Sequence, residues 1–339
     1  MSLLRPVGIV GTGSYLPPRI LTNHDLEKMV DTSDEWIRTR TGIRERRVAA
    51  EHMAASDLAV PAAERALAMA GIRAEEVDLI VVATATPDAF FPSTACVVQE
   101  RLGAVGGAAF DILAGCTGFL YALGVASQMI ATGAHNVGLV IGTEVLSKIT
   151  NWEDRSTCVL FGDGAGAAVL APVEPGYGIL GVHLGADGTG ASLLHIPAGG
   201  SKMPATEDTV KNKLHTIHML GSEVFKFAVR IMGEASLRAL ERAGLTKEEI
   251  DYFIPHQANI RIIEAACKRL NLPQEKVYIN LDRYGNMSSA SVPVALDEAY
   301  REGKIRKGHN LVLVAFGAGL TWGAAVVRWN LEAPPEAGV

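Results

Sequence analysis

The sequence repeats itself at a fixed spacing, and this internal repeat restricts the possible folds more than any other feature. The first block comprises AlaLeu at 66–67, AlaGly at 70–71, GluGlu at 75–76 and Asp78. The second block follows 173 residues later, with AlaLeu at 239–240, AlaGly at 243–244, GluGlu at 248–249 and Asp251. Each block predicts an amphipathic helix that stops at AlaGly, an acidic turn and then an apolar strand, at 79–82 and 252–254. We therefore expect one supersecondary unit to occur twice.

Two further matches follow in the same order along the chain. His135-Asn136, before the apolar run 137–141, recurs at an offset of 174 as His309-Asn310 before the run 311–315. The segment 166–169 (GAAV) recurs at an offset of 157 as 323–326. Because the offset falls by about 17 residues, we expect an insertion in the first copy between roughly residues 143 and 161.

The repeat predicts an α/β protein built from two halves, 1–174 and 175–339, joined near the turn-rich stretch 172–178. The runs 79–83, 137–141 and 311–316 are continuously apolar, which is typical of central strands buried on both faces. Helices alternate with these strands. We expect a layered arrangement with helices flanking the sheets and two buried helices between the halves.

One stretch lacks charged side chains and is long enough to raise the question of a membrane span. No Asp, Glu, Lys or Arg occurs between Asp111 and Glu144. Polar residues such as Ser127, Gln128 and Thr132 interrupt it, and Gly133 punctuates the chain. This pattern favours a buried helix followed by a buried strand, with no membrane association.

The composition excludes several classes of protein. The 339 residues are 48% apolar and 20% charged, which excludes disorder and collagen-like repetition. The net charge of −6 does not suggest a protein that coats nucleic acid. The four cysteines form no CxxC pair, so neither a disulfide framework nor a metal cluster is expected. A reducing cytoplasm is the simplest location, and the N-terminal residues show no secretory signal.

Cys116 is the candidate nucleophile. The segment 111–119 (DILAGCTGF) precedes the buried helix, predicted at about 116–132. At a strand-to-helix turn, the free N–H groups and the helix dipole are expected to lower the pKa of the Cys116 thiol. The alternative is that Cys116 packs as a small apolar residue. We retain that alternative for the other three cysteines: Cys96, Cys158 and Cys267.

His256 and Asn286 are the candidate partners of Cys116. His256 follows an apolar strand, and Asn286 precedes a helix predicted at 293–302. The offset of 174 maps Cys116 onto Ala290, so the Asn286 loop is the counterpart of the Cys116 turn. Taken alone, a histidine after proline is more often structural, and an asparagine before a helix is most simply a turn or cap residue. Their placement near the join of two equivalent halves predicts one shared site.

With these motifs in view, the chain resembles the β-ketoacyl-acyl carrier protein synthase III family, condensing enzymes of the thiolase-like fold. The similar segments are GTGSYLP at 11–17, DTSDEWI at 31–37, TRTGIRER at 39–46, the Cys116 turn, FGDGAGAAV at 161–169, PHQAN at 255–259, RYGN at 283–286 and FGAGLTWG at 316–323. A dinucleotide site is a poor alternative, because Leu16 stands where that fingerprint has its third glycine. The fold implied is a layered αβαβα arrangement of two duplicated halves.

The resemblance implies a decarboxylative Claisen condensation that begins fatty acid chains. Cys116 takes the acyl group of a short acyl-CoA, and malonyl-acyl carrier protein then supplies an enolate that is stabilised by His256 and Asn286. The backbone N–H groups of Cys116 and Ala318 would form the oxyanion hole. Family members often have three glycines where this chain has Ala318 in the middle, and a positive φ there would strain alanine. No metal or redox cofactor is implied, since coenzyme A enters as a thioester substrate.

The resemblance also implies binding residues. Trp36, Arg40 and Arg155 would hold the nucleotide of coenzyme A, and Arg155 lies in the insertion. Phe91 would reach across a homodimer interface and limit acyl length. Other residues would line the pantetheine tunnel: Gly221, Phe225, Asn259 and Phe316. For Trp36 and Phe91, ordinary packing is the alternative.

Arg261 and Lys268 lie on one face of the helix after His256 and suggest a docking surface for the acidic carrier protein. A solvated charged surface is the alternative.

Three other functions compete with a synthase III. A chalcone synthase-like or secondary-metabolism enzyme can share Cys116, His256 and Asn286. A papain-like hydrolase matches the Cys-to-His spacing of 140 residues but neither the local cysteine signature nor the duplication. A non-catalytic carrier-binding module does not explain the three polar residues together.

Overall fold

The computed structural model describes residues 4–333. The first three residues of the chain and the last six lie outside that range. The first residues of the predicted half 1–174, where a secretory signal was also sought, therefore lie outside the described residues. So do the last residues of the predicted half 175–339.

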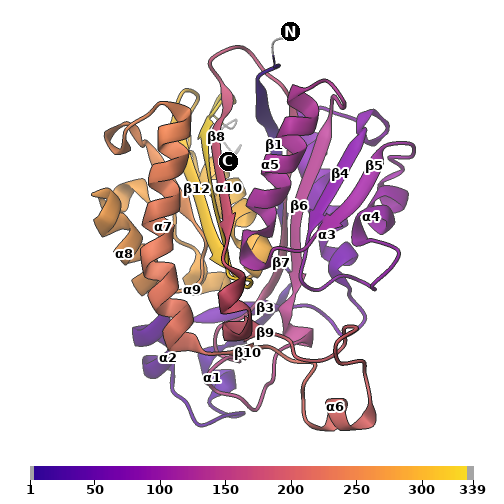
Figure 1. The fold of residues 1–339 in the computed structure, drawn as a ribbon, viewed down its shortest axis with the longest axis vertical. Helices are drawn as coiled ribbons and strands as arrows, with labels where there is room; N and C mark the ends of the chain where they lie inside the picture. The colour runs from indigo at the N-terminus through magenta and orange to yellow at the C-terminus, as the bar shows by residue number, and fades with distance from the viewer. Residues whose placement is uncertain (1–3, 334–339) are drawn as a thin grey trace, which may run out of the picture.

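Two sheets form the centre of the molecule (Figure 1). The first has the strand order β1 (Val7–Tyr15), β7 (Asp163–Pro172), β6 (Gly138–Val145), β4 (Leu79–Ala83) and β5 (Ala108–Ile112). The second has the order β8 (Gly178–Ala186), β13 (Thr321–Arg328), β12 (Asn310–Gly317) and β11 (Tyr252–Pro255).

The second sheet repeats the pairing of the first. β1 and β6 pair antiparallel with β7, as β8 and β12 pair antiparallel with β13. β4 pairs parallel with β6, as β11 does with β12. In the second sheet, the position that corresponds to the edge strand β5 is taken by a single parallel bridge between Phe253 and Val277. The matching order explains the sequence repeat, because equivalent strands need equivalent helices and turns around them.

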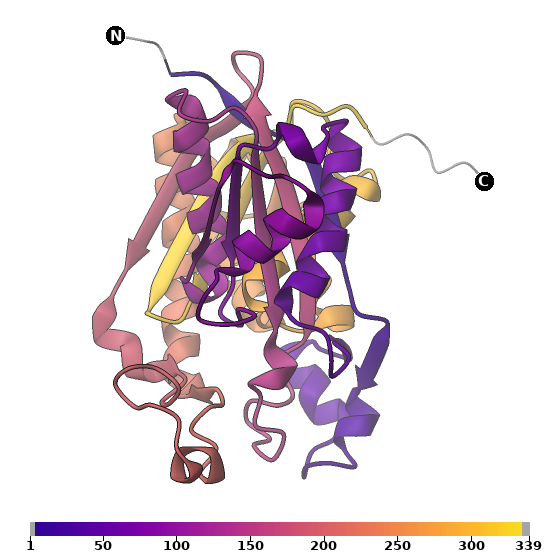
Figure 2. The ribbon, with the colours of Figure 1, turned by 90° about the vertical axis from the view of Figure 1, so that its right-hand side faces the viewer.

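Helices complete a five-layered arrangement, so the predicted αβαβα architecture is confirmed. Figure 2 shows helices on both sides of the central strands. α5 (Gly118–Ala131) and α10 (Ser291–Arg301) contact strands of both sheets and form the middle layer. α3 (Ala55–Ala70) packs against β1, β6 and β7, whereas α7 (Gly221–Ala243) packs against β8, β12 and β13. In the outer layers, α4 (Thr94–Leu102) packs against α3, and α8 (Ile260–Leu270) packs against α7.

The glycines at the start of the chain serve close packing between a strand and a helix. A Cβ atom on Gly11 would lie 2.3 Å from the carbonyl oxygen of Ala66, and one on Gly13 would lie 2.3 Å from that of Ala62. Both acceptors belong to α3. Larger residues would force this helix away from β1, so the motif has a structural explanation here.

The predicted elements differ from the observed ones mainly at their ends. The helix expected at 116–132 consists of a 3₁₀ turn, η2 (Gly115–Thr117), followed by α5 from Gly118. Cys116 thus lies before the α-helix rather than in its first turn. The strand expected at 137–141 continues to Val145, and the helix expected at 293–302 spans Ser291–Arg301.

The remaining short elements include a group at one end of the sheets, visible at the bottom of Figure 1. The shorter strands and helices are β2 (Arg19–Thr22), α1 (Asn23–Leu26), α2 (Asp34–Thr41), β3 (Glu45–Val48), β9 (Leu194–His195), α6 (Glu207–Lys211), β10 (His218–Met219) and α9 (Leu281–Tyr284). The other 3₁₀ turns are η1 (Ala74–Glu76), η3 (Leu146–Lys148), η4 (Gly188–Leu193), η5 (Lys247–Glu249), η6 (Gln274–Lys276) and η7 (Ser288–Ala290). Within residues 4–333, none of the helices combines the length and the apolar character needed to span a membrane.

Candidate active site

Cys116, His256 and Asn286 line one narrow cavity of about 100 Å³. They come from different elements, since Cys116 lies in η2, His256 follows β11 and Asn286 precedes η7. The turns η2 and η7 pack against each other at the starts of α5 and α10. The duplication therefore places the cysteine of one half and the polar residues of the other around one space.

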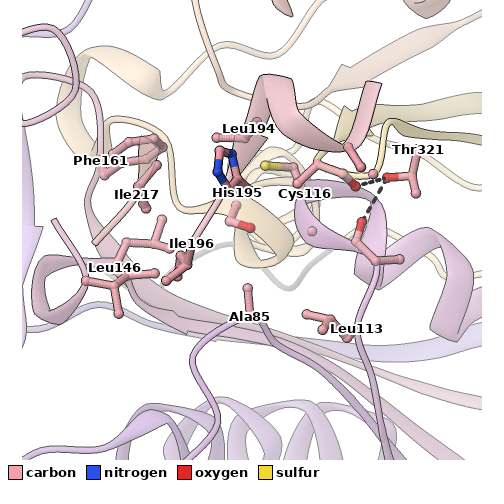
Figure 3. A pocket seen from close by; sticks show the side chains of 17 residues that line it. Ala85, Leu113, Cys116, Leu146, Phe161, Leu194, His195, Ile196, Ile217 and Thr321 are labelled. Carbon is pink, nitrogen blue, oxygen red and sulfur yellow. Dashed lines mark hydrogen bonds between the residues drawn. The ribbon is translucent and has the colours of Figure 1, made fainter. Parts of the chain in front are cut away.

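The Cys116 thiol also borders a second, larger cavity of about 500 Å³ (Figure 3). Most of its lining is apolar and includes Leu113, Leu146, Phe161, Leu194, Ile196 and Ile217. Gly317 allows the close approach of β12, because a Cβ there would lie 2.5 Å from the Cys116 backbone nitrogen. Cys116 consequently stands between a broad apolar cavity and a narrow one, to which His256, Asn259 and Asn286 contribute polar groups.

The expectation of a lowered thiol pKa at Cys116 is wrong for this structure. Burial raises the pKa of the thiol to about 12, and the nearby Glu144 acts in the same direction, while the Ser288 hydroxyl opposes them. The α-helix begins only at Gly118, beyond the cysteine. Desolvation therefore outweighs the helix dipole, and the thiol is protonated at neutral pH.

His256 is buried and neutral. Its side chain is 1% exposed, and burial lowers its pKa to about 3. The backbone N–H donates to the carbonyl oxygen of Val314 at 2.7 Å, which fixes the residue beside β12. Neither ring nitrogen has a hydrogen-bond partner among residues 4–333. One N–H of the neutral imidazole is thus available to a bound molecule.

Asn286 is held by its own backbone. Its N–H donates to the carbonyl oxygen of Leu160 at 2.9 Å, and its carbonyl accepts from the Gly162 N–H at 3.0 Å. The side-chain oxygen accepts from the Ser288 N–H at 2.8 Å. Because that oxygen is engaged, the side-chain NH₂ is the end of the carboxamide that a ligand in the cavity can use.

The expected strain at Ala318 does not occur. In the 317–319 loop the left-handed φ belongs to Gly319, at 140°, and not to Ala318. A Cβ on Gly115 would lie 2.9 Å from the Ala318 nitrogen, so Gly115 is needed for the loop to approach the Cys116 turn. Cys116 and Ala318 both line the larger cavity, and alanine is compatible with this backbone.

The predicted nucleotide-binding residues form a stack on the surface. The guanidinium carbons of Arg40 and Arg155 both lie 4.9 Å from the centroid of the Trp36 ring. Arg155 also donates to the backbone and the carboxylate of Asp31. This arrangement presents a planar indole beside two cations, which suits a planar, negatively charged ligand.

Four residues predicted to line a pantetheine tunnel share one cavity. Gly221, Phe225, Asn259 and Phe316 line the narrow cavity. The Asn259 side-chain NH₂ donates to the backbone carbonyl of Arg40 at 3.1 Å, which connects the tunnel with the Trp36 stack. One hydrogen bond thus joins the lining of the narrow cavity to the segment that carries Trp36 and Arg40.

Like the Trp36 stack, Phe91, Arg261 and Lys268 line neither cavity beside Cys116. Phe91 is 86% exposed. Arg261 and Lys268 are exposed on α8, and the Arg261 guanidinium lies 5.1 Å from the centroid of the Phe225 ring. Arg261 therefore borders the tunnel as well as the surface.

Sequence reasoning missed Glu144 and Ser288. Glu144 marked only the end of the uncharged stretch, yet it is fully buried beside the site. Ser288 lines the larger cavity with φ at +46°, which is uncommon for a residue other than glycine. The sequence offered one signal for Glu144, a single acidic residue at the end of a buried apolar strand. Nothing in the sequence indicated the left-handed backbone conformation of Ser288.

Within residues 4–333, no group of three or more His, Cys, Asp or Glu is placed to hold a metal ion.

Two family models match the chain. The model of 3-oxoacyl-[acyl-carrier-protein] synthase III matches residues 110–188, and the model of its C-terminal part matches residues 240–329. Beta-ketoacyl-[acyl-carrier-protein] synthase III of Caldanaerobacter subterraneus subsp. tengcongensis is 64% identical over 323 residues, covering 95% of this chain and 98% of that protein. The protein of the same name from Clostridioides difficile is 60% identical and covers 96% of this chain and 98% of its own.

The chain belongs to the 3-oxoacyl-[acyl-carrier-protein] synthase III family. It is a condensing acyltransferase of fatty acid synthesis with the thiolase-like fold. The crystal structure of the synthase III from Thermus thermophilus has a TM-score of 0.89 and 52% identity, covering 95% of this chain and 99% of that one. A priming β-ketosynthase of the R1128 polyketide pathway also matches, with a TM-score of 0.90 but 37% identity, over 99% of both chains. The higher identities to synthase III proteins disfavour the polyketide or chalcone synthase-like alternative.

Proposed function

We propose that this enzyme condenses a short acyl-CoA primer with malonyl-acyl carrier protein, using Cys116, His256 and Asn286. The observation that supports the proposal is their convergence on one narrow cavity. Cys116 attacks the thioester carbonyl of the primer, the carbon–sulfur bond to coenzyme A breaks, and an acyl thioester forms on the cysteine. The backbone N–H groups of Cys116 and Ala318 are the proposed donors to the carbonyl oxygen of this acyl group.

The second half-reaction uses the buried polar pair. Loss of CO₂ from the malonyl thioester leaves an enolate, whose oxygen accepts hydrogen bonds from His256 and the Asn286 side-chain NH₂. The enolate carbon attacks the acyl thioester, and the Cys116 sulfur leaves. His256 is suited to this role because burial lowers its pKa to about 3, so that it donates as a neutral imidazole. These steps require neither a metal ion nor a redox cofactor.

Substrate binding follows from the two cavities and the surface stack. The narrow cavity, which leads away from Cys116 past His256 and Asn259, is proposed to hold the pantetheine arm, while Trp36, Arg40 and Arg155 are proposed to hold the nucleotide. The apolar cavity beside Cys116 is proposed to hold the acyl group. Arg261 and Lys268 are proposed to dock the acidic carrier protein.

A homodimer in the cytoplasm is part of the proposal. β5 is an edge strand of the first sheet, and large apolar side chains are exposed near its end and in the loop before α4: Leu113, Phe90 and Phe91. An edge strand and exposed aromatic side chains favour association with a second copy. In that dimer Phe91 would enter the partner's acyl cavity. The free thiols of Cys96, Cys116, Cys158 and Cys267 support a reducing compartment.

The proposed reaction is tested by reconstitution with purified components. Acetyl-CoA and malonyl-acyl carrier protein should give one acetoacetyl-carrier product and one free coenzyme A per turnover. Iterated polyketide products, or hydrolysis alone, would contradict the proposal. A panel of acetyl, propionyl and branched primers then defines the acyl preference, which depends on the shape of the apolar cavity.

A further inference from the structure

Glu144 is a buried acid at the active site that the proposed reaction does not use. Its side chain lies at the end of β6 and is fully buried. The carboxyl oxygens lie 2.8 Å from the Thr86 hydroxyl, 2.8 Å from the Ser289 hydroxyl and 3.1 Å from the Ala85 nitrogen. None of these three groups carries a positive charge. An ionised Glu144 would therefore be a buried anion to which these neighbours supply no counter-charge, and burying such a group is costly.

The Ser289 hydroxyl indicates which protonation state of Glu144 fits the site. Its oxygen lies 2.8 Å from the carbonyl oxygen of Ala83 as well as 2.8 Å from a carboxyl oxygen of Glu144. A hydroxyl has one hydrogen, whereas a carbonyl oxygen and an ionised carboxylate can only accept. With a carboxylate, one of the two contacts would bring two oxygens together with no hydrogen between them. With a carboxylic acid, Glu144 donates to Ser289 and Ser289 donates to Ala83, so both contacts are hydrogen bonds.

The other contacts of Glu144 place the proton on one oxygen, Oε1. The Thr86 hydroxyl accepts from the Val145 N–H at 2.9 Å, so its own hydrogen can point to Oε2. The Ala85 N–H lies 3.1 Å from Oε2 and 3.2 Å from Oε1, and one of the two is sufficient to accept it. Oε1 is the oxygen beside the Ser289 hydroxyl, and the Ser289 N–H approaches it only to 3.4 Å. Burial favours the protonated state, because it raises the pKa of Glu144.

This carboxyl group connects two parts of the active site. One is the segment of Ala85, which lines the apolar cavity beside the nucleophile. The other is η7, which contains Ser289 and in which the Ser288 N–H donates to the Asn286 side-chain oxygen at 2.8 Å. Gly142 lets η7 lie directly on β6, since a Cβ there would lie 2.2 Å from the Ser289 carbonyl oxygen. The carboxyl group therefore fixes η7, and with it Asn286, relative to the cavity wall.

We propose that Glu144 is a positioning residue that acts as a neutral carboxylic acid. By donating to Ser289 and accepting from Thr86 and Ala85, the acid holds η7 in place. From there the Asn286 side chain directs its NH₂ group at the enolate oxygen. Glu144 exchanges no proton with the substrates, so the balance of the proposed reaction is unchanged. The inference rests on the proposed role of Asn286 in condensation.

A neutral acid also suits the nucleophile. As an anion, Glu144 raises the pKa of the Cys116 thiol and so opposes its ionisation. The neutral acid exerts no such repulsion. A thiolate formed on Cys116 therefore meets no second buried anion at Glu144 while it attacks the primer.

The protonation state is measured in the free enzyme by infrared difference spectroscopy of the wild type and Glu144→Gln, from pH 6 to pH 9. We expect a carboxylic acid C=O band that the wild type has, that the variant lacks and that stays constant over this range. A carboxylate band in its place would overturn the proposal. The measurement involves no substrate, so it separates this inference from the proposed function, which fails instead if the wild type takes up no acyl group on Cys116.

The positioning role is measured from the rates of Cys116 acylation and of condensation with malonyl-carrier. Glu144→Gln keeps a donor and an acceptor in place of the acid, so both rates should stay close to those of the wild type. Glu144→Leu keeps only the volume, and its condensation should slow by about 10- to 100-fold while acylation changes less, because Asn286 acts in condensation. Ser289→Ala removes the acceptor of the proposed O–H and should show the same selective loss. A Gln variant as slow as the Leu variant, or equal losses in both half-reactions, would contradict the role.

The matched control is Asp163→Asn, because Asp163 is another buried acid with a serine hydroxyl beside it. One of its oxygens accepts from the Ser147 N–H at 2.8 Å and the other from the Ala49 N–H at 2.7 Å, so an amide NH₂ would meet an N–H in either orientation. This variant should lower the free energy of unfolding at pH 7 much more than Glu144→Gln does. Equal losses in the two variants would mean that Glu144 is ionised, and the proposal would fail.

Discussion

The His256 imidazole meets the Phe316 ring edge-on, with ring centroids 5.6 Å apart and planes inclined by 71°. Phe316 precedes the glycine loop at the end of β12, and His256 follows the neighbouring strand β11. The contact adds an apolar ring to the burial of His256, whose ring nitrogens have no partner among residues 4–333. Burial keeps His256 neutral, and the neutral imidazole still has one N–H to donate to a bound molecule.

Loss of either enolate-stabilising residue should separate the two half-reactions. His256→Ala and Asn286→Ala are expected to lower the condensation rate by about 100- to 1,000-fold, because each removes one donor from the developing oxyanion. Acylation of Cys116 should change much less. Separate assays of acyl-enzyme formation and of product release from malonyl-carrier measure the two effects. Equal losses in both assays would count against the assignment.

Protonation of His256 should couple folding to pH. The native pKa is about 3 and the ordinary value is 6.5, so below pH 6.5 the unfolded chain binds a proton that the native protein excludes. The free energy of unfolding should consequently fall as the pH drops, by up to about 1.4 kcal/mol per pH unit from this group. The buried acids Glu144 and Asp163, whose pKa values are raised, act in the opposite direction.

Denaturant unfolding of the wild type and of His256→Asn between pH 5 and pH 6.5 isolates the histidine, because both proteins retain the acids. The variant should show a smaller decrease in stability on acidification. Parallel stability curves would mean that His256 becomes protonated in the native state.

Trp36 should affect the nucleotide end of the substrate alone. Trp36→Ala is expected to raise the KM for acyl-CoA about tenfold, since it removes the ring that Arg40 and Arg155 flank at 4.9 Å. An acyl-pantetheine substrate, which lacks the nucleotide, provides the control and should be used equally well by both proteins. A similar loss with acyl-pantetheine would show that Trp36 supports the fold of α2 instead.

Charge reversal on α8 should weaken the carrier reaction selectively. Lys268→Glu is expected to raise the KM for malonyl-carrier several-fold at low salt and to leave acylation by acyl-CoA unchanged. Arg261→Glu should affect both reactions, because Arg261 also lies on Phe225 in the tunnel lining. If Lys268→Glu alters neither KM nor its salt dependence, α8 does not dock the carrier.

The repeat predicted the fold because equivalent strands need equivalent neighbours. Gly71 and Gly244 illustrate this, since both end a helix with φ near +65° to +69° and both follow the repeated alanine. The convergence of Cys116 with His256 and Asn286 could be expected for the same reason. The thiol pKa could not, because it depends on how deeply the sulfur is buried and on where α5 begins.

Glu144 and Ser288 were missed for a related reason. They come together because η7, which contains Ser288, packs against both η2 and β6, two segments more than 140 residues earlier in the chain. A left-handed serine has no sequence signature. The large apolar cavity likewise depends on side chains from many elements, including the segment around His195 and Ile217.

The proposed chemistry depends most directly on Cys116 as the residue that receives the acyl group. Intact-protein mass spectrometry after incubation with acetyl-CoA, followed by peptide mapping, tests this. One acetyl group on Cys116 is expected, and none in Cys116→Ala. Acetylation of Cys96, Cys158 or Cys267 in place of Cys116, or an adduct that persists in Cys116→Ala, would contradict it.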